Sequence, residues 1–329
     1  MSLIEPKILS TRKNNKLKLF ANKLFFLLFC NDHIKNDSLV IDSFGLPYEY
    51  KKRLQEHNCK MVLNHAGSVN AYAEYFMEKM KLRGGLESYL NHVKTYDHVL
   101  FQSNSQALEL DSLLGSGDER TLVVRPSASE NDIQACKSES NLLFKNNKVN
   151  ITVVGSVQRR KGQDFLVPIA QKLDELNCEY VINVVGNVLE KDFYCQLLKA
   201  VTTNGLSEKI VFHGFQSDHL SYMNDSDIVL QVSREEGVSR ILREAMALGK
   251  AIVSFRLGGT AELLEENFDC FLAEPEQVDE ITNKLYQLIN DGNKRLSLGR
   301  NARLNFEEKY SYASYSKEVN KLVRLMVGK

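Results

Sequence analysis

The chain has 329 residues, of which 43% are hydrophobic and 26% are charged. This composition is typical of a globular protein, and the length favours two domains over one. The 42 basic side chains (Lys and Arg) balance the 42 acidic ones, so the charge gives no support for wrapping nucleic acid.

The N-terminal residues and the cysteines bear on the cellular compartment. The first 15 residues lack the apolar core of a signal peptide. Residues 16–30 (KLKLFANKLFFLLFC) combine lysines with an apolar run that is shorter than the roughly 20 residues of a membrane span. This segment could lie on a membrane surface as a basic amphipathic helix, or form a core helix with surface lysines. The cysteines form neither a CxxC pair nor a disulfide framework, which favours reduced thiols in a cytosolic protein without a structural zinc. They are Cys30, Cys59, Cys136, Cys178, Cys195 and Cys270.

The first part of the chain alternates Val- and Ile-rich runs with segments of helical period, which is typical of parallel sheets covered by helices. Strands are predicted at residues 38–44, 59–65, 97–103 and 121–127. The polar stretch at 127–148 lacks strong periodicity and is interpreted as a connection between domains. We place the boundary near Asn146.

The second part repeats the alternation more cleanly, so we expect a doubly wound α/β domain there. Its strands are predicted at residues 149–156, 179–186, 209–215, 227–233 and 251–256. The last residues, 311–329, are expected to form a terminal helix after a break at EEKYS.

In open parallel sheets, ligands bind at the carboxyl ends of the strands. The loop VVGSVQRRKGQ places Arg159, Arg160 and Lys161 between two glycines just before a predicted helix. Cations beside a helix N-terminus are typical of an anion site, although such a loop could also be simply solvated. The loop is neither GxGxxG nor a P-loop, which disfavours dinucleotide hydride chemistry and P-loop NTPase chemistry.

Two further stretches follow predicted strands. Gly258 and Gly259 in RLGGTAELL could bring backbone N–H groups close to an anion, or form an ordinary turn. The stretch SREEGVSRILREAMALGKAIVS holds Glu236 in a loop and Glu244 eight residues later, inside the helix that follows. Two carboxylates at this spacing could accept hydrogen bonds from the hydroxyl groups of two sugars that are joined by a phosphate bridge.

Taken together, these motifs resemble the retaining, nucleotide-sugar-dependent glycosyltransferases of family 4. The resemblance covers about residues 149–310 and centres on E-x7-E followed by A-M-A-x-G. It implies the GT-B fold: two Rossmann-like doubly wound domains that face a cleft, here with a shortened N-terminal domain. The expected domains are residues 1–145 on the acceptor side, 146–310 for the nucleotide sugar, and a terminal helix, 311–329, that could cross back to the N-terminal domain.

The resemblance also implies roles for individual residues. Lys161 matches the lysine that neutralises the donor diphosphate, Glu236 the glutamate that holds hexose hydroxyls, and Glu244 the one that binds the ribose. Amides of Gly258 and Gly259 would lie near the phosphates. The remaining donor-site residues implied are Gly155, Arg159, Arg160, His213 in the base loop, Gly237, Val238 and Ser239.

The sequence departs from the family pattern in two places. The usual arginine after the strand glycine is Ser156, so Arg159 or Arg160 must supply the second cation or it is missing. The usual E-G-F-G ends in Val238-Ser239. In the first domain, VLNHAGS resembles the strand end at which these enzymes carry a histidine beside the reacting sugar, so His65 is a catalytic candidate. Alternatively, His65 is a structural histidine at a strand end, with its polar atoms hydrogen-bonded within the protein.

The implied activity is transfer of a hexose from a UDP- or GDP-sugar to an acceptor hydroxyl with retained configuration, catalysed by His65, Lys161 and Glu236. No metal site and no further cofactor are expected. The family suggests a saccharide or lipid-linked saccharide as the acceptor, in the synthesis of bacterial surface polysaccharide or lipopolysaccharide. The expected location is the cytoplasm, including the inner face of the plasma membrane. The resemblance leaves open whether the chain forms an oligomer or binds a partner subunit. The alternatives are a non-catalytic scaffold or donor-binding subunit of another glycosyltransferase, and a sugar-nucleotide epimerase or hydrolase.

Overall fold

The computed structural model describes residues 39–42, 48–56, 58–65, 85–114, 120–138, 143–144 and 146–327. The chain divides into two compact units, Met1–Val62 and Leu63–Lys329. The first unit contains β1 (Leu39–Asp42), α2 (Tyr48–Glu56) and the start of β2 (Lys60–Asn64). Both strands predicted there are confirmed, whereas the amphipathic segment predicted at residues 16–30 lies outside the described residues.

The second unit begins with short helices and strands that alternate along the chain. Its first elements are α4 (Gly85–Val93), β3 (His98–Phe101), α5 (Asn104–Leu114) and β4 (Thr121–Val123). β3 and β4 pair in parallel, with Val99 beside Thr121. Both were predicted from the sequence. β4 is shorter than expected because its partner β3 ends at Phe101, which pairs with Val123, and the N–H of Arg125 donates to Glu318 instead of to a strand.

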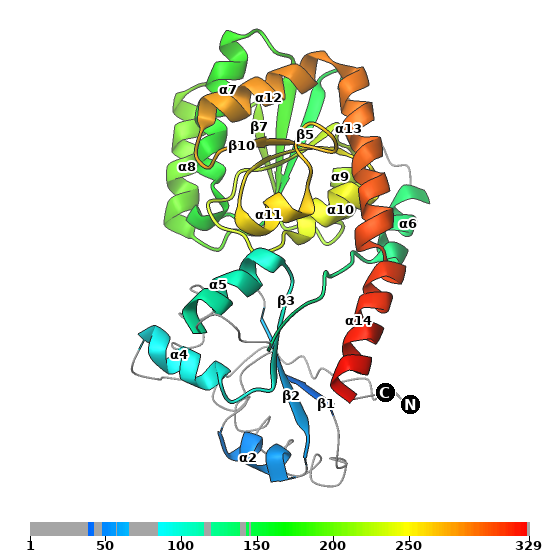
Figure 1. Ribbon diagram of the computed structural model, residues 1–329. Coiled ribbons are helices and arrows are strands. Elements are labelled where there is room, and N and C mark those ends of the chain that lie inside the picture. The colour runs from blue at the N-terminus through cyan, green and yellow to red at the C-terminus, as the bar shows by residue number, and fades with distance from the viewer. Residues whose placement is uncertain are drawn as a thin grey trace. The chain divides into compact units, whose positions relative to one another are not determined.

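A six-stranded parallel sheet forms the centre of the second unit (Figure 1). Its strand order is β10-β9-β8-β5-β6-β7. The direction of the strand order reverses between β5 and β8, and such a reversal is where open α/β sheets bind ligands, at the carboxyl ends of the strands. The strands are β5 (Val149–Val154), β6 (Tyr180–Val185), β7 (Ile210–Gly214), β8 (Ile228–Gln231), β9 (Ala251–Phe255) and β10 (Phe271–Ala273).

The five strands predicted for this sheet are confirmed, and β10 was missed. β10 has only three residues, which is too short for a periodic signal in sequence. It forms because Phe271 and its neighbours extend the sheet beside β9 in parallel register. All three residues are buried.

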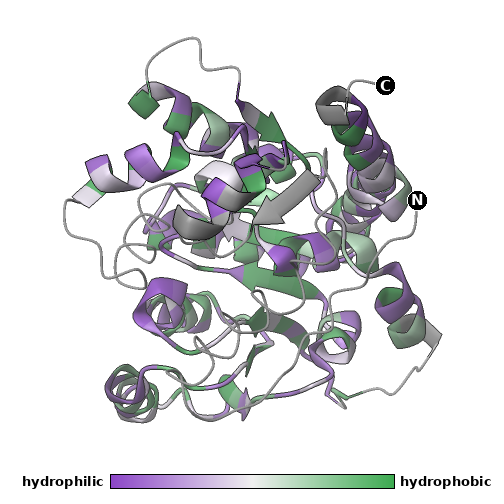
Figure 2. Ribbon diagram, turned by 90° about the horizontal axis from the view of Figure 1, so that it is seen from below, coloured by the Kyte–Doolittle hydropathy of each residue, from purple (hydrophilic) through white to green (hydrophobic). Residues whose placement is uncertain are grey.

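Helices cover both faces of this sheet. One core cluster joins α7, α8 and α12 to side chains such as Ile151 and Ile182, and the other joins α9, α10 and α13 to Val229 and Ile252. The strands of this sheet are accordingly rich in hydrophobic residues, which are drawn green in Figure 2. The helices are η1 (Arg159–Lys161), η2 (Gln163–Phe165), α7 (Leu166–Glu175), α8 (Lys191–Thr203), α9 (His219–Asp225), α10 (Arg240–Leu248), α11 (Gly258–Leu263), α12 (Val278–Asn290), α13 (Gly292–Asn305), the π-helical η3 (Phe306–Tyr310) and α14 (Tyr312–Val327).

The stretch predicted as an aperiodic connection contains a helix, α6 (Glu130–Ser138). Only a few of its residues are apolar, and two of them, Ile133 and Cys136, are buried in the cluster that contains α9 and α10. Packing against these helices therefore stabilises a helix whose sequence is mostly polar. The terminal helix α14 was predicted, and its Glu318 accepts hydrogen bonds from the backbone N–H (2.9 Å) and Nη1 (2.8 Å) of Arg125, which follows β4.

Candidate functional site

The candidate site lies at the carboxyl ends of β5 and β8, where the strand order reverses. The loop after β5 carries η1, and the loop after β8 leads to α10. The two loops touch through Gly162, which has φ 69° and an ideal Cβ position only 2.0 Å from the carbonyl oxygen of Val232. No side chain fits there, so glycine is needed both for the left-handed backbone and for the close approach.

This contact brings together two of the predicted residues. Lys161 Nζ forms an ion pair with Glu236 Oε1, and Ser233 Oγ donates to the same oxygen at 2.7 Å. The two charged side chains are 19% and 10% exposed. In the part of the chain that the structure describes, no group donates to the second oxygen, Oε2. The pair therefore presents one open carboxylate oxygen beside a cation. The Lys161 stem runs past Gly155, where an added Cβ would lie 3.7 Å from its Cδ.

Arg159 and Arg160, the other predicted cations, have other partners. Arg160 Nη1 donates to the carbonyl of Glu235 at 3.1 Å. The Arg159 guanidinium lies over the ring of Phe193, 5.4 Å from its centroid, and its backbone N–H donates to Glu190. Both arginines are exposed. The structure thus brings Lys161, but neither arginine, into contact with Glu236.

Arg234 is a site residue that sequence reasoning missed. Its Nη1 and Nη2 donate to the two carboxylate oxygens of Asp164 at 2.8 and 2.7 Å, and Nη1 also donates to the Arg159 carbonyl at 2.8 Å. Its guanidinium lies 4.2 Å from the ring centroid of Phe165. The bidentate partner Asp164 raises the pKa of Arg234. The side chain therefore fastens the turn that carries Lys161 to the loop that carries Glu236.

Glu244 occupies the second turn of α10 and is 3% exposed. His219 Nε2, from α9, lies 2.9 Å from its Oε2, and Arg240 Nε donates to its Oε1 at 2.7 Å. Burial acts to raise the pKa of Glu244, but the bonds from His219 and Arg240 outweigh burial and lower it. Sequence reasoning missed both partners, although Arg240 stands four residues before Glu244, a spacing that signals a helical ion pair.

The start of α10 is fixed by side chains and by a tight backbone contact. Ser239 Oγ caps the helix by accepting from the Leu242 N–H at 3.3 Å, and it donates to Gln231 Oε1 at 2.5 Å. An ideal Cβ on Gly259 would lie 2.1 Å from the carbonyl oxygen of Gly237. The predicted pair Gly258–Gly259, at the start of α11, therefore lies directly against the predicted segment Gly237–Ser239.

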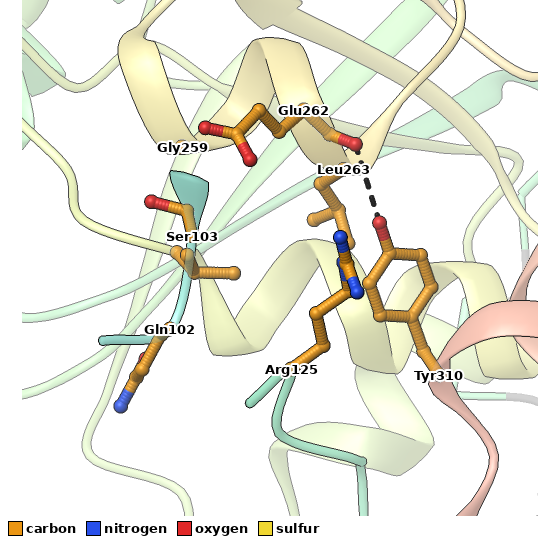
Figure 3. A pocket seen from close by; sticks show the side chains of 8 residues that line it. Gln102, Ser103, Arg125, Gly259, Glu262, Leu263 and Tyr310 are labelled. Carbon is orange, nitrogen blue, oxygen red and sulfur yellow. Dashed lines mark hydrogen bonds between the residues drawn. The ribbon is translucent and has the colours of Figure 1, made fainter. Parts of the chain in front are cut away.

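A small pocket adjoins this contact (Figure 3). Val238 and Gly259 line it together with residues that the sequence gave no role: Gln102, Ser103, Arg125, Glu262, Leu263 and Tyr310. The Glu262 carboxylate accepts from the backbone N–H groups of Asn104, at 2.8 Å, and of Ser105, at the start of α5. Burial acts to raise the pKa of Glu262, and these hydrogen bonds outweigh it and lower the pKa. Glu262 thereby ties α11 to the N-terminus of α5.

The two predicted histidines lie in other surroundings. His213, on β7, has Nε2 2.9 Å from Asn183 Oδ1, its ring packs against Tyr222, and burial lowers its pKa. His65 follows β2 and is fully buried, with its ring 4.8 Å from that of Phe101. Both rings thus pack within the protein, and the catalytic role of His65 and the base-loop role of His213 stay predictions.

The described residues contain no group of three or more His, Cys, Asp or Glu side chains arranged to hold a metal ion. Among the same residues, no helix combines the length and the apolar character that crossing a membrane requires.

Comparison with known proteins places this arrangement in a family. The family model of the glycosyl transferases group 1 matches residues 137–305, which is more than half of the chain. The chain therefore belongs to the glycosyl transferases group 1 family. An uncharacterized glycosyltransferase of Haemophilus influenzae is 29% identical over 169 residues, covering 51% of this chain and 47% of the relative. The poly(ribitol-phosphate) alpha-N-acetylglucosaminyltransferase of Staphylococcus aureus is 25% identical over 166 residues, covering 49% and 33%.

A solved structure extends the likeness to most of the chain. The Anabaena protein HepE in complex with UDP and glucose superposes with a TM-score of 0.69 at 21% identity, covering 83% of this chain and 74% of HepE. The chain has the α/β GT-B fold with parallel sheets. It spans less than half of the length of each of the two curated relatives described above.

Proposed function

We propose that this chain is a retaining glycosyltransferase of family 4, which moves a hexose from a nucleoside diphosphate sugar to an acceptor hydroxyl. The observation that carries the proposal is the Lys161–Glu236 pair at the point where the strand order reverses, with Glu244 eight residues further on. A donor lying across this point would meet the Lys161 cation and its partner Glu236.

Each residue then has a role. Lys161 neutralises the diphosphate, and the open oxygen of Glu236 accepts from hexose hydroxyls. Glu244 accepts from the ribose, while backbone N–H groups of Gly258 and Gly259 approach the phosphates at the start of α11. Charge develops on the diphosphate as it leaves, so cations and oriented amides aimed at it supply most of the rate enhancement. His65 remains our candidate group beside the reacting sugar.

The relatives support a donor and an acceptor class for the proposal. HepE binds UDP and glucose, and the Staphylococcus aureus relative is named for transfer of N-acetylglucosamine to a poly(ribitol-phosphate). By analogy we infer a UDP-sugar or GDP-sugar donor and a saccharide or lipid-linked acceptor in bacterial surface polysaccharide synthesis, including lipopolysaccharide. We also propose that the enzyme acts at the inner face of the membrane and that it forms an oligomer. The proposed domains are residues 1–145, 146–310 and 311–329.

The test is calorimetric titration with UDP-, GDP- and ADP-sugars, on the wild type and on Glu244→Gln. Glutamine keeps the shape of Glu244 and removes its charge. We expect one nucleotide sugar to bind the wild type and to bind the variant at least about tenfold more weakly, because a charged acceptor is lost. Glu307→Gln, on another helix and also paired with an arginine four residues away, is the matched control and should bind as the wild type does.

Product analysis then distinguishes the reactions. Transfer to an added acceptor with retained anomeric configuration, read by NMR, is the expected result. An epimerised nucleotide sugar, or free hexose as the only product in the presence of acceptors, would contradict transfer. If no nucleotide sugar binds the wild type, the proposal fails and the E-x7-E region is a retained fold element of a scaffold.

A further inference from the structure

Arg240 stands midway between the two glutamates of the site. It is the first residue of α10, four residues after Glu236 and four before Glu244. Its side chain is 68% exposed, whereas that of Glu244 is only 4% exposed beneath it. Nε donates to Glu244 Oε1 at 2.7 Å. In the described part of the chain, nothing accepts from its Nη1 or Nη2, so both are open to solvent.

The other cations of the two loops are already engaged. Lys161 is paired with Glu236, and Arg234 with Asp164 and Glu276. Arg160 donates to a backbone carbonyl, and Arg159 lies on the ring of Phe193. Position 156, beside the strand end, is a serine whose hydroxyl accepts from Gln158. A diphosphate that entered the site would therefore meet one cation, Lys161, whose charge Glu236 already balances.

Glu244 poses a second difficulty for a bound nucleotide. Both of its carboxylate oxygens already accept hydrogen bonds, one from Arg240 and one from His219. A ribose hydroxyl needs one of these oxygens to become reachable. Arg240 is the partner that can leave, because its guanidinium is largely in solvent, while the His219 side chain is 20% exposed.

We propose that Arg240 is the second diphosphate-binding cation and that it exchanges partners when the donor binds. The guanidinium leaves Glu244 Oε1 to the ribose hydroxyls and turns its open Nη1 and Nη2 to the phosphate oxygens, which a guanidinium can bind with two parallel hydrogen bonds. The exchange gives the guanidinium another anion as its partner, while Glu244 keeps its hydrogen bond with His219 and gains those of the ribose hydroxyls. This inference rests on the proposed function and adds a residue to its donor site.

The proposal is tested by calorimetric titration with nucleosides and nucleoside diphosphates. The wild type, Arg240→Gln and Arg240→Lys are each titrated with three pairs of ligands: uridine and UDP, guanosine and GDP, and adenosine and ADP. For the base that the wild type binds, we expect Arg240→Gln to weaken diphosphate binding by about tenfold or more and to change nucleoside binding by less than about twofold. Arg240→Lys keeps the charge and should recover part of the loss.

A control comes from Arg303 on α13, which pairs with Glu307 four residues later at 2.6 Å and also donates to the Ala247 carbonyl near the end of α10. Arg303→Gln should bind both ligands as the wild type does, and thermal unfolding verifies that each variant is folded. If the wild type and Arg240→Gln bind the diphosphate equally, the inference about Arg240 is overturned and the proposed function still stands. Tighter binding of both ligands by Arg240→Gln overturns it too, since Arg240 would then only cover Glu244. If the wild type binds none of these ligands, the proposed function fails and this inference fails with it.

Discussion

Glu236 and Glu244 are eight residues apart and are held in different ways. Glu236 lies in an irregular loop, where Lys161 and Ser233 reach it from other loop positions. Glu244 lies inside α10, where His219 and Arg240 reach it from two helices. The position of Glu236 therefore depends on how two loops meet, while that of Glu244 follows from the helix itself. Backbone changes should disturb the first, and side-chain changes the second.

The largest effect is expected from a change at Gly162, where the two loops of the site meet. In Gly162→Ala the new Cβ would lie 2.0 Å from the Val232 carbonyl oxygen, at φ 69°. We expect the free energy of unfolding to fall by about 3 kcal/mol, the combined cost of a left-handed alanine and a steric overlap. Urea denaturation measures the change. The loop that carries Glu236 must move in this variant, so donor binding should fall with it.

A second glycine separates the two costs. Gly205 has the same φ of 69°, but an added Cβ there would meet nothing within 4 Å. Gly205→Ala should therefore lose only about 1 kcal/mol, from backbone strain alone. Equal losses in the two variants would contradict the claim that Gly162 is required for the approach of the two loops.

An intermediate effect is expected from Arg234→Met, which removes the clamp between the loops and keeps an apolar stem. The Arg234–Asp164 pair is about one-third exposed, at 28% and 36%, so water screens it and the loss of stability should be about 1 kcal/mol. Donor affinity should fall by about threefold, because Lys161 is less well fixed. Arg256→Met, which removes a similarly exposed pair with Glu266 and Glu274, should lower stability without lowering donor affinity. An equal loss of affinity in both variants would deny Arg234 a positioning role.

The smallest effect concerns the pH dependence of stability at Glu244. Its folded pKa lies below the ordinary value of 4.5, because His219 and Arg240 outweigh burial. The ionised group therefore stabilises the fold above that value, and the contribution is lost as the pH falls through the folded pKa. Glu244→Gln removes a group that titrates in this window, so its stability should fall less steeply below pH 4.5 than that of the wild type. Parallel curves from urea denaturation at a series of pH values would contradict the lowered pKa.

The sequence predicted the longer strands because residues buried on both faces of a parallel sheet form continuous apolar runs. It missed β10, which has three residues, and α6, which is mostly polar. β10 is stabilised by pairing with β9, and α6 by packing against α9 and α10. Because these contacts lie outside the two segments, the local sequence pattern does not predict them.

The candidate site shows the same division. The sequence by itself singled out Lys161, Glu236, Glu244 and the glycine pair at 258–259, because strand ends, glycines and charges are legible from local patterns. Only the tertiary structure revealed that Arg159 and Arg160 have partners other than Glu236, that Arg234 clamps the two loops, and that His219 and Arg240 hold Glu244. Side-chain partners depend on how loops and helices pack in three dimensions, and spacing along the chain does not encode that packing.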